Sequence, residues 1–98
     1  HYPSGKSREV GSRYLEALEK FPPDAALGEA IVPAAIKSTP QGIKSISILD
    51  VQEGKLEAAY KRTIGMMSMF HSIEGLVYTA EVQLKVEEAM GIIGLDTL

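Results

Sequence analysis

Residues 76–86 read LVYTAEVQLKV, and apolar and polar side chains alternate along the whole run. One side carries Tyr78, Ala80, Val82, Leu84 and Val86, and the other carries Val77, Thr79, Glu81, Gln83 and Lys85. Successive side chains of a β-strand point to opposite faces of the sheet, so this alternation is typical of a strand with one buried face. The run therefore predicts a half-buried strand late in the sequence.

An amphipathic helix is predicted directly before this strand. Its apolar side chains recur at the three- and four-residue intervals of one helix face: Leu56, Ala59, Tyr60, Thr63, Ile64, Met67 and Phe70. Gly75 stands where a helix C-terminal cap is expected. A first helix is predicted to begin at Ser4 or Ser7, either of which can cap it, and to end at Pro22-Pro23. A short third helix is predicted over residues 87–93.

Two further strands are predicted between the helices, over residues 27–37 and 43–51. Both are rich in β-branched and small apolar side chains, and Thr39-Pro40-Gln41-Gly42 between them is typical of a hairpin turn. Pro33 cannot donate a backbone hydrogen bond, so a bulge on an edge strand is expected there. At the start, His1-Tyr2-Pro3 is interpreted as the end of a strand that begins upstream.

The element order places the chain in the α+β class, as a single domain over residues 1–98 with a ferredoxin-like sandwich of two helices on an antiparallel sheet and a truncated first strand. With the hairpin near residue 40 and the final helix, this order resembles the dimeric α/β-barrel superfamily. Its small members are similar to muconolactone isomerases, antibiotic-biosynthesis monooxygenases and stress-responsive barrel proteins. The resemblance rests on element order and matches no specific family. It implies a homodimer of sheets packed face to face, and a small apolar ligand held between sheet and helices.

Composition excludes several classes of function. The formal charge is −3 and the basic residues are scattered, which disfavours nucleic acid as a partner. There is no cysteine, so thiolate catalysis and sulfur-based metal sites are excluded, and a cytoplasmic location is expected. No apolar run approaches the roughly 20 residues of a membrane span. Gly5-Lys6-Ser7 resembles the tail of a phosphate-binding loop, but Pro3 falls inside the loop, so no cofactor is expected.

Four side chains are candidates for proton transfer. His1 would end the first strand beside Tyr2 and face the cavity, although a loose terminal residue is the simpler interpretation. His71 falls at the end of the second predicted helix, where a cation stabilises the helix dipole, so capping is favoured over catalysis there. Glu81 lies on the polar side of the 76–86 strand and is expected near the centre of a dimer interface. No cluster of metal ligands is visible.

Two functions remain open from the sequence. The first is a small-molecule-binding homodimer, either a binding protein or a cofactor-independent enzyme acting on a small apolar compound. The alternative is a non-catalytic interaction or regulatory homodimer module. Both assume a core in which Ile46, Ile48, Ala80 and Val82 face the helices and Ser45, Ser47, Thr79 and Glu81 face away. The full predicted core is Leu18, Phe21, Ile46, Ile48, Leu56, Tyr60, Ile64, Met67, Ala80 and Val82.

Overall fold

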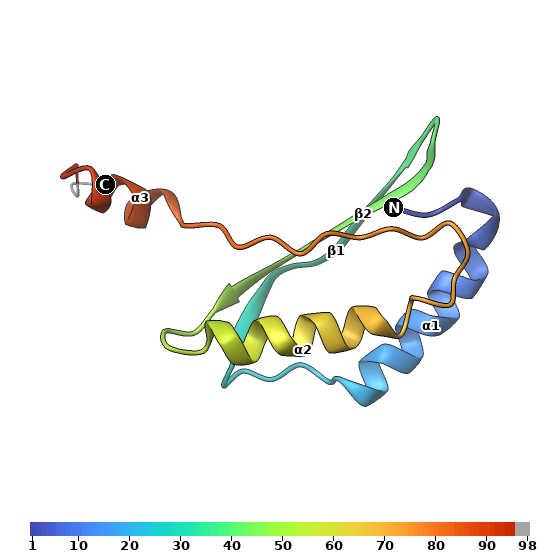
Figure 1. Ribbon diagram of the computed structural model, residues 1–98, viewed down its shortest axis with the longest axis horizontal. Coiled ribbons are helices and arrows are strands. Elements are labelled where there is room, and N and C mark those ends of the chain that lie inside the picture. Colours follow the sequence, from blue (N-terminus) through green and yellow to red (C-terminus); the bar gives the residue numbers. More distant parts are fainter. Residues whose placement is uncertain (96–98) are drawn as a thin grey trace.

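Three α-helices and a two-stranded antiparallel sheet make up the α+β fold of the computed structural model, which describes residues 1–95 (Figure 1). A single 3-10 turn, η1 (Ser4–Lys6), leads into α1 (Ser7–Lys20). The hairpin strands β1 (Gly28–Thr39) and β2 (Gly42–Val51) follow, then α2 (Leu56–Ser68) and α3 (Val86–Ile92). Both long helices lie to one side of the hairpin in Figure 1.

The hairpin confirms the predicted turn and the predicted bulge. Thr39 Oγ1 donates to the Gly42 carbonyl at 2.8 Å and accepts from the Gln41 N–H at 3.2 Å, which closes the turn. The antiparallel register shifts between Ala30 and Val32 and again between Val32 and Ala35, so Pro33 lies within an irregular part of the ladder. The Ser47 hydroxyl donates to the Pro33 carbonyl at 2.7 Å and satisfies a group that a regular ladder would have paired.

His1 and Tyr2 form backbone hydrogen bonds with two different segments, one on each side of them. Tyr2 and Ile43 exchange both backbone hydrogen bonds, at 2.8 and 2.9 Å. His1 and Val77 do the same on the other side, at 2.9 and 3.0 Å. The N-terminal residues therefore lie between β2 and the segment that precedes α3, in the position of a central strand.

Gly42 and Gly75 allow this arrangement. Gly42 has φ +126°, and a Cβ atom there would lie 2.4 Å from the Tyr2 carbonyl oxygen. Gly75 has φ +80°, and its Cβ would lie 2.7 Å from Pro3 Cγ. The prediction that Gly75 caps the second helix is wrong, because α2 ends at Ser68. The glycine instead turns the chain against Pro3.

The prediction of a regular strand over residues 76–86 is also wrong. Residues 76–85 belong to no strand or helix, and α3 begins at Val86. The segment runs alongside the hairpin and carries α3 away from α1 and α2 (Figure 1). Its backbone pairs with His1 at Val77, and within residues 1–95 the backbone of residues 78–84 pairs with no other segment. A strand needs a hydrogen-bonded neighbour along its length, and the alternating pattern alone does not supply one.

A cluster of buried side chains lies between α1 and the end of α2, and Tyr2 and Ala59 are buried outside it. Ala17, Phe70 and Ile73 form its core, with Val10, Met66, Met67, Met69 and Leu76 packed around them. Arg13 on α1 donates to the Met69 carbonyl and, at 3.0 Å, to Ser72 Oγ. Arg13 thus supplies the cation at the end of α2 that the sequence assigns to His71.

The ten residues of the predicted core are not buried together. Leu18, Phe21, Ile64, Met67 and Ala80 are half-buried, and Ile46, Ile48, Leu56, Tyr60 and Val82 are exposed. An open hollow of about 1930 Å³ is lined by the hairpin and residues 76–85 on one side and by the two long helices on the other. The expectation that these residues are buried together is wrong because this hollow keeps the hairpin side chains from packing against the helices.

Candidate functional site

The pairing of the N-terminal residues identifies the two faces of β2. Directly opposed residues in adjacent strands point to the same side of a sheet. Tyr2 is opposite Ile43, and the antiparallel His1–Val77 pair places Leu76 opposite Tyr2 on its other side. Ile43, Tyr2 and Leu76 therefore share one face. Tyr2 is only 7% exposed, and Leu76 packs against the Ala17–Phe70 cluster. This is the inner face, on the side of the helices.

The opposite, outer face of the hairpin carries Ile46 and Ile48, whereas Ile36, Ile43 and Leu49 lie on the inner face. Alternation from Ile43 places Ser45 and Ser47 on the inner face and Lys44, Ile46 and Ile48 on the outer one. The assignment of Ile46 and Ile48 to the helix side is therefore wrong, and Thr79 and Glu81 share the outer face with these isoleucines. The same alternation places Asp50 and Lys85 on the outer face, and the ion pair between them agrees with this assignment of the two faces.

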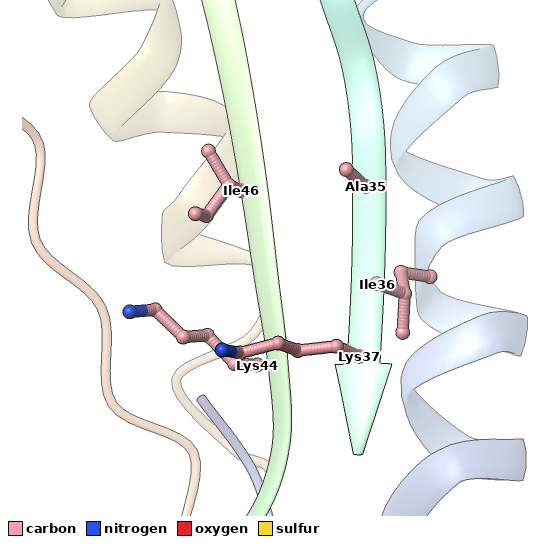
Figure 2. Close-up of a pocket in the computed structure, with 5 residues that line it drawn as sticks. All are labelled: Ala35, Ile36, Lys37, Lys44 and Ile46. Atoms are coloured by element: carbon pink, nitrogen blue, oxygen red, sulfur yellow. The ribbon is translucent and has the colours of Figure 1, made fainter. Parts of the chain in front are cut away.

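An apolar stripe crosses the middle of the outer face. It consists of Val32, Ala35, Ile46 and Ile48, paired across the two strands as Val32–Ile48 and Ala35–Ile46, and is called the outer patch below. Ile46 and Ile48 are each 48% exposed. In Figure 2 the side chains of Ala35, Ile46, Lys37 and Lys44 extend to one side of the hairpin and Ile36 to the other. The shallow depression between these residues has a volume of about 130 Å³, which is smaller than the roughly 300–1,000 Å³ of typical ligand pockets.

Opposite charges flank the two ends of the outer patch. Lys37 lies directly opposite Lys44 near the turn, and Glu29 lies opposite Asp50 at the far end. Among residues 1–95 neither lysine has an acidic oxygen within 4.0 Å. Like charges directly opposite each other weaken an antiparallel pair, so the lysine end is electrostatically unfavourable in the single chain.

The acidic end is partly compensated within the chain. Lys85 Nζ lies 3.0 Å from Asp50 Oδ2 and donates to it. This hydrogen bond and the negative charge of Asp50 raise the pKa of the Lys85 ammonium above its usual 10.5. Glu29 has no such partner among the described residues.

The four predicted proton-transfer residues do not form one cluster. Tyr2 is buried and His1 is exposed on the opposite face of the same short strand. His71 Nε2 lies 3.1 Å from the Tyr78 hydroxyl, and the two rings stack with centroids 5.7 Å apart. Glu81 is exposed and pairs with none of these side chains. The sequence reasoning missed Tyr78 as a partner of His71, although Gly75 between them signalled a chain reversal.

No group of three or more possible metal-ligating His, Asp or Glu side chains occurs in the part of the chain that the structure describes. In the same part, no helix has both the length and the apolar character needed to cross a membrane. No protein-family model, no curated protein and no solved structure matches the chain.

Proposed function

We propose that the chain is a non-catalytic interaction module that forms a two-fold homodimer through its outer sheet face. The observation that carries this proposal is the order of side chains along that face, which runs from Lys37 and Lys44 through the outer patch to Glu29 and Asp50. A two-fold interface brings each residue i against residue j and j against i, so it favours a surface whose two ends complement each other.

The positions of the charges fit such an axis. Lys44 and Asp50 are six residues apart on β2, about 20 Å, and their midpoint falls between Ile46 and Ile48. On β1 the midpoint of Lys37 and Glu29 falls at Pro33, beside Val32. A two-fold axis that lies in the plane of the interface and crosses the strands at the outer patch therefore places the lysine end of one copy on the acidic end of the other and covers the isoleucines of both.

Glu81 lies close to the same axis. Counting from the His1–Val77 and Tyr2–Ile43 pairs, Glu81 is level with Ile48. Glu81 therefore lies near the centre of the proposed interface.

Ferredoxin-like topology is also part of the proposal. The order of segments across the sheet is β1, β2, His1–Tyr2 and residues 76–85, which is the order that a ferredoxin-like sheet requires.

Small-molecule catalysis has less support. The hollow of about 1930 Å³ is open and exceeds the roughly 300–1,000 Å³ of formed ligand sites. The candidate acid–base residues are separated, and the closest pair, His71 and Tyr78, is held by stacking near the surface. A homodimer needs none of these groups to react.

Sedimentation equilibrium with matched variants tests the proposal. Ile48→Asp adds two carboxylates, one from each copy, beside the axis, and we expect the dimer dissociation constant to rise by about 100-fold or more. Ile36→Asp makes the same exchange at an exposed residue of the inner face and should leave the constant within about threefold. Equal effects of the two variants, or a wild-type chain of monomer mass at low micromolar concentration, would contradict the proposal.

A further inference from the structure

The space between β2 and the segment that precedes α3 is one strand wide at His1 and Tyr2, which pair with both of them. Its two edges are Ser45–Val51 and Tyr78–Lys85, and it is called the strand slot below. His1 and Tyr2 fill one end of it, because each pairs with one of the two edges. At the other end the edges are joined by the side chains of Asp50 and Lys85 instead of by backbone hydrogen bonds.

The backbone groups of both edges are oriented into the slot. Ile43 turns its N–H and C=O toward Tyr2, so Ser45, Ser47, Leu49 and Val51 turn theirs the same way, by the two-residue repeat of a strand. Val77 likewise turns its groups toward His1, and in an extended segment Thr79, Glu81 and Gln83 follow. The two edges thus present facing rows of backbone donors and acceptors that have no partner within residues 1–95. An added β-strand can pair with such rows.

We propose that the strand slot is the seat of a β-strand that continues His1–Tyr2 in the N-terminal direction, antiparallel to both edges. The register follows from the existing pairs. The position directly before His1 is opposed by Ser45 and Tyr78, the third position before it by Ser47 and Ala80, and the fifth by Leu49 and Val82. Seven residues reach from His1 to the end of β2.

The neighbours define the side chains that the strand needs. Its inner-face positions lie between Ser45 and Tyr78 and between Ser47 and Ala80, and three of these four residues are small. Below them lies the open hollow, whose far wall includes Tyr60, Met66 and Met67. Large apolar side chains at alternate positions would fill this volume and cover the exposed inner residues.

The outer-face positions have different surroundings. They lie between Ile46 and Thr79 and between Ile48 and Glu81, at the outer surface. β-branched side chains with a polar group, such as threonine, suit this environment. The slot therefore specifies an alternating strand of seven residues, apolar at the first position before His1 and at every second position upstream.

Hydrogen exchange on three forms of the chain tests this proposal: the unextended chain of residues 1–98, the chain extended before His1 by Val-Thr-Val-Thr-Val-Thr-Val, and the chain extended by Val-Thr-Pro-Thr-Pro-Thr-Val. The prolines of the control remove the N–H groups that would pair with Ser47 and Leu49. We expect the first extension to slow exchange of the Ser45, Ser47, Leu49, Thr79 and Glu81 amides by about tenfold or more. The control should leave their rates near those of the unextended chain.

Two outcomes would overturn the proposal. Unchanged exchange at both edges in the first extended chain would show that the slot takes no strand. Protection by the same heptapeptide added as a free molecule, but not by the fused one, would overturn the in-line register. Neither outcome affects the proposed dimer, because the slot pairs edge to edge and the dimer packs outer face to outer face.

Discussion

Lys37 and Lys44 face each other directly across the β1–β2 hairpin, with no acidic side chain at ion-pair distance among residues 1–95. A cross-strand pair of like charges costs stability in an isolated chain. The pair lies at one end of the outer patch, and Glu29, which also lacks an ion-pair partner in this part of the chain, lies at the other end. This polarity makes the outer face self-complementary under a two-fold axis.

Substitution of Gly42 should destabilise the fold by detaching the N-terminal residues from β2. Gly42→Ala forces a Cβ atom to within 2.4 Å of the Tyr2 carbonyl and strains a residue with φ +126°. We expect a loss of about 1–3 kcal/mol in the free energy of unfolding, measured by urea denaturation. Gly11→Ala is the matched control, since its Cβ meets nothing within 4 Å in the middle of α1. It should stabilise by about 0.5–1 kcal/mol. A loss of similar size in both variants would contradict the role assigned to Gly42.

Removal of the Arg13 side chain should loosen the end of α2. Its guanidinium donates to the Met69 carbonyl and to Ser72 Oγ, and hydrogen bonds to charged groups contribute about 1.5–3 kcal/mol. Arg13→Ala should therefore speed hydrogen exchange of the Phe70, His71 and Ile73 amides relative to those of the hairpin. Arg8→Ala, at an exposed position of the same helix, should leave these rates unchanged. If Arg8→Ala had the same effect, Arg13 would not be the cap.

Breaking the Asp50–Lys85 ion pair should change the behaviour of the chain at alkaline pH. The pKa of Lys85 is raised in the folded chain, so the pair stabilises the fold below the usual pKa of 10.5 and this contribution is lost as pH rises through the higher folded value. Asp50→Asn should return the Lys85 titration, followed by the ¹³Cε chemical shift, toward 10.5. An unchanged titration would show that Asp50 is not the cause.

The hairpin could be predicted from the sequence because its signals are local. The turn at Thr39–Gly42 and the bulge around Pro33 depend on residues close together in the chain, and both predictions are confirmed. The first helix is similarly bounded by its own sequence and ends at Lys20, next to Phe21 and the two prolines.

The faces of β2 could not be predicted in the same way. Ser45 and Ser47 alternate with Ile46 and Ile48, and hydrophobicity alone assigns the isoleucines to the helix side. The register is set by the pairing of Tyr2 with Ile43, and a shift of one residue exchanges the two faces. For residues 76–86 the alternating pattern is clear, but strand formation also depends on a neighbour that lies outside the segment. The candidate interface was therefore visible in the sequence only as an uneven mixture of small polar and aliphatic residues.

A mixing experiment with charge-reversed chains tests the self-complementary outer face most directly. Lys37→Glu makes positions 37 and 29 both acidic, and Glu29→Lys makes them both basic, without disturbing the Asp50–Lys85 pair. Each variant alone should dimerise at least about tenfold more weakly than the wild type, because position 37 of each copy then meets a like charge at position 29 of the other. In the heterodimer of an equimolar mixture, each position 37 meets an opposite charge at position 29 and Lys44 still meets Asp50, so sedimentation equilibrium should recover a heterodimer close to wild-type affinity. Variants that each remain fully dimeric, or a mixture that stays as monomeric as its components, would contradict the proposed two-fold interface.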